Sequence, residues 1–194
     1  MQDWQDLLRY PLADDRWILK MLIGSLIILL PILNLTLLGY AIACMDMGMR
    51  GSRKLPQWEA WRDYIGDALS AGVILIVYLL IPMILTMVLC HIPLIGVFLG
   101  AAAIILAGGL IPMALAAYAV RRDISEAFAL GDIIKQIANN LDTYLLAYFS
   151  LILLFCWELA LIIAIPYLAW LWAFIMFYEA VIFSYLIGCL ARAA

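Results

Sequence analysis

Two long apolar segments without a formal charge, residues 68–89 and 97–120, set the strongest constraint on how this chain folds. A helix of about 20 apolar residues is long enough to cross a bilayer, and both segments reach that length. Between them lies the short stretch Cys90–Gly96, which contains a proline and a glycine. Because a proline ends a helix and so short a connection returns the chain alongside itself, we predict a transmembrane hairpin over residues 68–120.

The composition extends this interpretation to the whole chain. Of its 194 residues, 69% are hydrophobic and 13% are charged, whereas soluble domains are about half apolar and about a quarter charged. Several membrane spans leave no room for a separate soluble domain. We therefore predict an all-α, polytopic transmembrane helical bundle in the plasma membrane, with residues 1–194 forming a single integral membrane domain.

The apolar run that begins at Trp17 is interrupted by Pro31 and could form one kinked span or two short helices. All 11 lysines and arginines lie away from the proline turns at Pro31, Pro93 and Pro166. If the first run is a hairpin, every positive charge falls on one side of the membrane, as the positive-inside rule requires for the cytoplasmic side. We therefore favour about six helices with both termini in the cytoplasm, arranged as three hairpins over about residues 15–50, 68–120 and 143–190.

Amphipathic stretches flank these hairpins. Apolar residues recur at helical spacing over about residues 3–10, 57–66 and 124–142, with charged residues between them. Such patterns predict short helices that lie in the membrane interface. At the start of the first apolar run, we expect Trp17 and Lys20 to lie at the level of the lipid headgroups.

Glu158 and Glu179 are the two acidic residues that lie well inside apolar runs. An ionised carboxylate at the bilayer centre costs about 2.5–3.5 kcal/mol on insertion scales. At 1.5 Å per residue, Glu158 is about 11 Å and Glu179 about 18 Å from the turn of their hairpin. They could form a proton or cation relay or contact a partner subunit. The alternative is a protonated acid that bonds a serine, a tyrosine or a backbone carbonyl.

Small and basic residues suggest two further kinds of contact. Gly96 and Gly100 stand four residues apart and allow close helix packing, either within this bundle or in an oligomer. Basic residues clustered between the hairpins are candidates for binding anionic lipid headgroups: Arg50, Arg53, Lys54, Arg121 and Arg122.

The motifs of several enzyme classes are missing from the sequence. It contains no HExxH, no phosphate-binding glycine loop and no GxSxG. The single histidine, His91, has no ligand-type residues close to it in sequence and makes a poor metal site. We therefore predict a protein that is not an enzyme, with no catalytic residue, no metal and no cofactor. The short basic clusters do not suggest nucleic-acid binding.

Several short motifs in the first half of the chain resemble a known family. They are Tyr10-Pro11, Asp15-Arg16-Trp17, Pro31, Gly39-Tyr40 and Leu55-Pro56-Gln57-Trp58, followed by an amphipathic stretch that ends in Asp67. Together they resemble the domain of unknown function 4013, a family of small multi-pass membrane proteins of bacteria and archaea. The resemblance implies a membrane location and a helical architecture, and it assigns no activity.

Two functions are consistent with these features. The first is a non-enzymatic scaffold or accessory subunit that contacts the lipid bilayer and either other membrane subunits or further copies of itself. The second is a small transporter or channel that uses Glu158 and Glu179.

Overall fold

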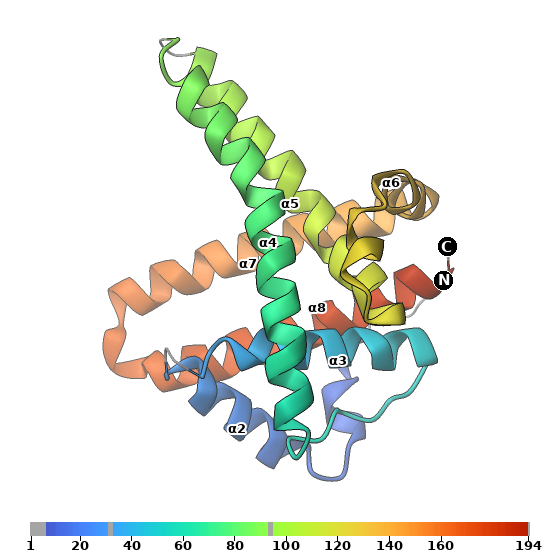
Figure 1. Ribbon diagram of the computed structural model, residues 1–194. Helices are drawn as coiled ribbons and strands as arrows, with labels where there is room; N and C mark the ends of the chain where they lie inside the picture. The colour runs from blue at the N-terminus through green and yellow to red at the C-terminus, as the bar shows by residue number, and fades with distance from the viewer. Residues whose placement is uncertain (1–6, 31–32, 93–94, 194) are drawn as a thin grey trace.

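The computed structural model of the protein is all-α, and it describes residues 7–30, 33–92 and 95–193 (Figure 1). Within these ranges the helices are α2 (Trp17–Ile28), α3 (Thr36–Arg50), α4 (Trp61–Leu89), α5 (Ile95–Arg121), α6 (Leu130–Asn139), α7 (Leu141–Ala164) and α8 (Ala169–Ala193). Three short 3-10 helices connect them: η1 (Pro11–Ala13), η2 (Ile124–Phe128) and η3 (Pro166–Leu168).

Four of the described helices, α4, α5, α7 and α8, are long and apolar enough to cross a membrane. The two helices of the first apolar run are shorter, with 12 residues in α2 and 15 in α3. At 1.5 Å per residue they measure about 18 and 22 Å, less than the roughly 30 Å of a hydrocarbon core. Four of the described helices could therefore span a membrane, as expected of a helical membrane protein, and the crossing of α2 and α3 remains a prediction.

The first apolar run forms two helices, but they contact each other at few residues, whereas the helices of the predicted hairpin would pack closely. Instead α8 packs against both of them, and α3 also packs on α4. Glycines bring α3 and α8 into backbone contact: a Cβ at Gly48 would lie 2.2 Å from the Tyr185 carbonyl oxygen, and one at Gly188 would lie 2.0 Å from the Met45 carbonyl oxygen. The core therefore consists of α3 and α8 with α2 and α4 around them.

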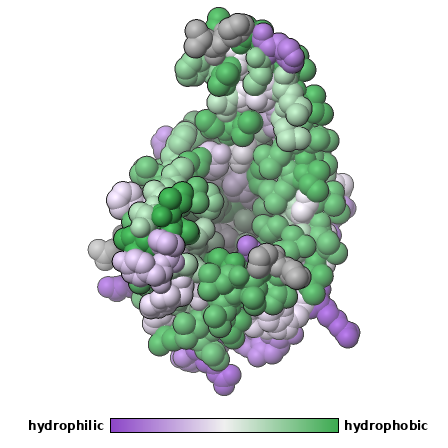
Figure 2. Space-filling model, turned by 90° about the vertical axis from the view of Figure 1, so that its left-hand side faces the viewer, coloured by the Kyte–Doolittle hydropathy of each residue, from purple (hydrophilic) through white to green (hydrophobic). Residues whose placement is uncertain are grey.

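The long hairpins diverge from this core. In Figure 1 the α4–α5 hairpin projects away from the rest of the molecule and runs in a different direction from α7 and α8. Only 17% of the most apolar stretch of α4, 11% of that of α5 and 11% of that of α7 is buried, against 50% in α8. Figure 2 shows apolar surface on both sides of a hollow between the projecting hairpin and the body below it.

The two glycines proposed for helix packing lie between α4 and α5. A Cβ at Gly96 would lie 1.8 Å from the Leu89 carbonyl oxygen, and one at Gly100 would lie 2.6 Å from the side chain of Thr86. Both positions therefore allow the hairpin to close on itself. The small size of these two glycines therefore serves a contact between helices of the same chain.

The predicted interfacial helices differ from the structure. The stretch 57–66 is not a separate helix, because α4 begins at Trp61 and continues without a break into the span. The stretch 124–142 is divided into η2, α6 and the start of α7, since Ala129 and Asn140 both leave helical geometry. Of the stretch 3–10, only residues 7–10 lie within the described part of the chain, and Leu7 and Leu8 there are helical.

Candidate functional site

Glu158 is buried on a helix that is otherwise turned outward. Only 3% of its surface is exposed, and it is the single buried side chain in the half of α7 nearest the turn. Its neighbours are apolar and exposed, among them Leu153 at 71% and Trp157 at 63%. In a lipid environment this arrangement is the expected one, because apolar side chains face the acyl chains and a carboxylate faces the protein.

Glu179 lies in a groove between α7 and α8. The groove has a volume of about 130 Å³ and is lined by Leu7, Leu8, Ala147, Ser150, Leu151, Leu154, Glu179, Ile182, Phe183 and Leu186. Glu179 is the one ionisable side chain in this lining. The groove is therefore an apolar space with a single carboxylate on its wall.

The lining residues also define the register of the two helices. Leu154 and Glu179 lie at one end of the groove and Ala147 and Leu186 at the other, as the antiparallel direction of the helices requires. One helical turn beyond Leu154 is Glu158, because residues four apart share a helix face. At the height of Glu158 along the helix axes, α8 contributes the residues between Trp172 and Glu179, which are seven positions apart. We call this line of residues the α7–α8 seam: Ser150, Glu158, Trp172 and Glu179.

Two polar atoms of this seam lack a partner. Among the described residues, neither Oε1 of Glu158 nor Nε1 of Trp172 has a hydrogen-bond partner, although both atoms are shielded from solvent. No lysine, arginine or histidine occurs between residues 136 and 191. Buried polar groups in native proteins are almost always paired, so an unpaired acid here leaves room for a proton, a cation or a ligand. The sequence identified both glutamates, and it did not identify Trp172.

A second polar region joins the N-terminal part of the chain to the connection between α3 and α4. Asp14 and Lys20 form a buried ion pair with Nζ and Oδ2 2.8 Å apart. Lys20 also donates to the Leu55 carbonyl oxygen at 2.9 Å, and the Leu55 N–H donates to Asp14 at 3.1 Å. Lys20 therefore lies inside the protein, and its position at headgroup level remains a prediction.

The pKa of Asp14 reflects these bonds. Burial raises the pKa of its carboxyl, but the hydrogen bond from Lys20 and those from the Arg16 and Leu55 N–H groups outweigh burial. The net result is a pKa below the ordinary value of an aspartate. Asp14 is therefore held in its charged form.

The segment 54–58 is fastened along its whole length. Its successive carbonyl oxygens each accept a hydrogen bond from a side chain of another element: Lys54 from Tyr10 (3.2 Å), Leu55 from Lys20 (2.9 Å), Pro56 from Tyr40 (3.3 Å) and Gln57 from Tyr64 (2.5 Å). The Trp58 Nε1–H donates back to the Lys20 carbonyl oxygen at 3.1 Å. We call segment 54–58 with these partners the polar clasp.

Aromatic packing covers the polar clasp. The rings of Tyr40 and Trp58 are stacked with centroids 4.2 Å apart, and Tyr64 and Phe177 lie against the same pair. Most of the motifs that carry the family resemblance belong to this region, including Tyr10, Tyr40 and Leu55–Trp58. Those motifs therefore lie where the chain is held together.

Asp67 forms a third polar group at the start of α4. Its carboxylate accepts a hydrogen bond from the Tyr118 hydroxyl at 3.0 Å and forms an ion pair with Arg122. Asp67 is buried by these contacts. This pairing ties the beginning of α4 to the end of α5, and it explains why the predicted interfacial stretch can continue into the span.

The basic residues proposed to bind headgroups lie at helix ends remote from the hairpin turns. Arg50 is ion-paired with Asp46, Arg121 with Glu126 and Arg122 with Asp67. Arg53 and Lys54 belong to the connection between α3 and α4. Headgroup binding by this set remains a prediction.

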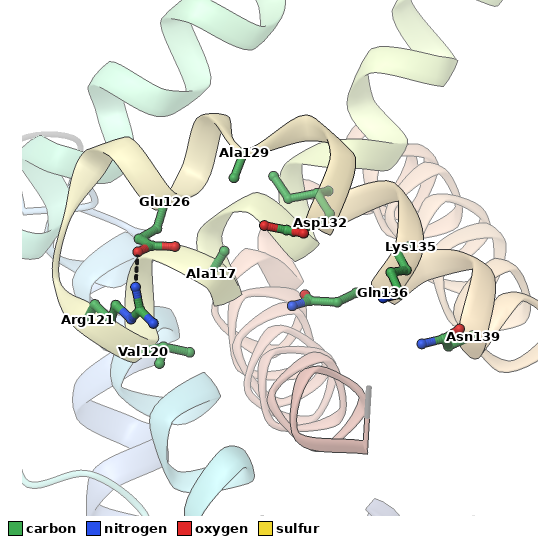
Figure 3. Close-up of a pocket in the computed structure, with 10 residues that line it drawn as sticks. Ala117, Val120, Arg121, Glu126, Ala129, Asp132, Lys135, Gln136 and Asn139 are labelled. Carbon is green, nitrogen blue, oxygen red and sulfur yellow. Dashed lines mark hydrogen bonds and ion pairs between the residues drawn. The ribbon is translucent and has the colours of Figure 1, made fainter.

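A second cavity, of about 330 Å³, lies between the end of α5, η2 and α6 (Figure 3). Its wall carries two cations, Arg121 and Lys135, and two carboxylates, Glu126 and Asp132. In Figure 3 Arg121 and Glu126 are joined as an ion pair. The formal charges of the wall cancel, so the cavity favours neither anions nor cations.

Comparison with known proteins gives one match. Neither a curated protein nor a solved structure matches the chain. The family model described as a protein of unknown function, DUF4013, matches residues 22–191. Because this match covers most of the chain and confirms the resemblance carried by the motifs, the protein belongs to the DUF4013 family.

Proposed function

We propose that the protein is a non-enzymatic, multi-pass subunit of a prokaryotic plasma membrane, with both termini in the cytoplasm. In this proposal it acts as a scaffold or accessory subunit and assembles laterally with other membrane helices or with further copies of itself. The charge pattern supports the orientation, because the lysines and arginines avoid the hairpin turns.

The observation that supports assembly is the exposure of the long hairpins. At most 17% of the apolar stretch of each of α4, α5 and α7 is buried inside the chain. A helix that entered the hollow in Figure 2 would contact two apolar walls at once. A helix that packed against a single lipid-facing helix would contact only one apolar surface. Close packing between helices is what drives association in a bilayer, so a two-sided contact favours a protein partner.

The test is the mass of the protein extracted in a mild detergent. A tagged full-length chain is purified and measured by native mass spectrometry, and co-purifying proteins are identified. We expect an oligomer or a defined complex. A monomer without a co-purifying partner would remove the support for assembly.

Introduced cysteines locate the contact. Ile81 is on the exposed face of α4, and Ile74 on the same helix is fully buried. In a background without native cysteines, Ile81→Cys should cross-link in membranes, and Ile74→Cys provides the matched control. Equal cross-linking at the two positions would contradict a contact through the exposed face.

A second candidate function is proton or cation transfer through Glu158 and Glu179. It is supported by the α7–α8 seam, in which two carboxylates lie one helical turn apart along the helix axes and no basic residue lines the adjoining groove. In proteoliposomes, Glu158→Gln or Glu179→Gln should abolish an ion or proton flux that wild type supports. Glu59→Gln, an exposed acid between α3 and α4, is the control. Unchanged flux in both seam variants would exclude this function.

A further inference from the structure

We propose that the groove between α7 and α8 binds a lipophilic cation, with the apolar part of the molecule inside the groove and its positive charge beside Glu179. This inference deepens the second candidate function by naming its ligand class. Binding is measured without any flux, so a failure of transport and a failure of binding are separate outcomes.

The size and lining of the groove define the apolar part of the ligand. Its volume of about 130 Å³ is close to that of a protein cavity of about 150 Å³ that takes up benzene. Eight of the ten lining residues are leucine, isoleucine, phenylalanine or alanine. The groove therefore suits one aromatic ring or a short hydrocarbon chain.

The charge on the wall defines the polar part. Glu179 is half-buried and has no hydrogen-bond or ion-pair partner among the described residues, and no basic residue lines the groove with it. A carboxylate in an apolar space is costly unless a cation or a proton compensates it. A positively charged ligand supplies this compensation, whereas an anion would be repelled and a neutral molecule would leave the carboxylate unpaired.

Glu158 strengthens this preference. It lies one helical turn from the groove, toward the η3 end of the hairpin. Only 3% of its surface is exposed, and its Oε1 has no hydrogen-bond partner within the described residues. A second unpaired carboxylate beside the groove adds to the negative potential there. The two acids are therefore not equivalent: Glu179 touches the ligand, and Glu158 acts on it through space.

Leu7 and Leu8 of the N-terminal segment complete the lining of the groove. The segment is fixed to α8 by the Tyr178 hydroxyl, which donates to the Leu8 carbonyl oxygen at 2.6 Å, and by stacked rings of Tyr10 and Tyr185 with centroids 3.8 Å apart. The N-terminal segment therefore forms a fixed third wall of the groove beside α7 and α8.

The probe for this site is benzyltrimethylammonium, which joins one aromatic ring to a fixed positive charge. Its neutral counterpart, neopentylbenzene, has the same shape without the charge. Binding of each to the purified full-length protein in lipid nanodiscs is measured by equilibrium dialysis. We expect the cation to bind at least roughly tenfold more tightly than the neutral compound, a factor typical of a charge-assisted contact.

Three variants separate charge from shape. Glu179→Gln should weaken binding of the cation by roughly tenfold or more and leave the neutral compound unaffected. Ser150→Phe fills the groove and should abolish binding of both compounds. Glu59→Gln removes an exposed acid that does not line the groove and should change neither affinity.

Each alternative result is decisive. Equal affinity of wild type for the cation and its neutral counterpart would overturn the proposal, and so would full retention of cation binding in Glu179→Gln. Absence of binding in wild type would do the same. Monodisperse elution of each variant by size-exclusion chromatography shows that a loss of binding is not a loss of folding.

Discussion

The polar clasp and the α7–α8 seam use buried polar residues in opposite ways. In the polar clasp, carbonyl oxygens from Lys54 to Gln57 all have donors, and Lys20 faces Asp14 as well as a carbonyl. In the α7–α8 seam, Glu158 and Trp172 each leave a shielded atom without a partner among the described residues. A network in which every buried polar group has a hydrogen-bond partner stabilises the fold, whereas a network with unpaired groups can bind a proton, a cation or a ligand.

The difference also concerns charge. The polar clasp combines an acid with a base, so its burial is compensated within the chain. The α7–α8 seam contains acids alone, so its compensation has to come from protons, from a bound cation or from a partner. Substitutions should therefore destabilise the polar clasp strongly and the α7–α8 seam hardly at all.

The largest effect is expected for Lys20→Met. This change leaves Asp14 buried without its cation, and loss of one partner of a buried pair costs about 3–5 kcal/mol. The free energy of unfolding in detergent, measured by denaturant titration, should fall by that amount. Arg50→Met, which removes a base from an exposed pair with Asp46, is the control and should cost less than about 1 kcal/mol. A similar cost for both variants would contradict the distinction.

A smaller effect is expected for Tyr40→Phe. The ring can keep its stacking on Trp58, but the carbonyl oxygen of Pro56 loses its donor. An unsatisfied buried acceptor costs about 1–3 kcal/mol, and thermal unfolding followed by tryptophan fluorescence measures it. Tyr167→Phe changes an exposed tyrosine near η3 and should leave the unfolding temperature unchanged. An unaltered unfolding temperature in Tyr40→Phe would show that this hydrogen bond contributes nothing.

The polar clasp should also respond to acid. Because the folded-state pKa of Asp14 is lowered, its contribution to stability is complete above the unfolded pKa of about 3.9. That contribution is lost as the pH falls further, through the lower folded-state pKa. Asp14→Asn should be less stable than wild type at neutral pH, and the difference should shrink below about pH 4. A constant difference at all pH values would contradict this linkage.

The α7–α8 seam should show the smallest change in stability. Glu158→Gln keeps the shape of the side chain and removes an unpaired acid whose ionised form is costly in a bilayer. The free energy of unfolding should stay within about 0.5 kcal/mol of wild type or rise. A loss comparable with that of Lys20→Met would show that Glu158 has a structural partner, and the contrast between the two regions would fail.

The length and apolarity of residues 68–89 and 97–120 were enough to predict the α4–α5 hairpin, because these are properties of the chain itself. The two glutamates could be found in the same way. Their placement along one seam could not, because it depends on the register that η3 sets between α7 and α8. The spacing of Trp172, Glu179 and Leu186 by seven residues was the available signal.

The role of Lys20 was missed for a related reason. A lysine near the start of an apolar helix usually reaches the headgroups, and the residues that bury it come from the distant segment 54–58. The packing of α2 and α3 was equally hidden. Each apolar segment predicts a helix, but nothing in residues 15–50 indicates that both helices pack against α8.

The position of α8 has a consequence for biogenesis. The helices α2 and α3 precede α8 in the chain, yet both of them pack against α8. Until residues 169–193 have been synthesised, Gly48 has no backbone to contact and Phe177 cannot reach the rings of Tyr40 and Trp58. The core is therefore completed only after α8 has been made, and a chain truncated before α8 leaves α2 and α3 without this partner.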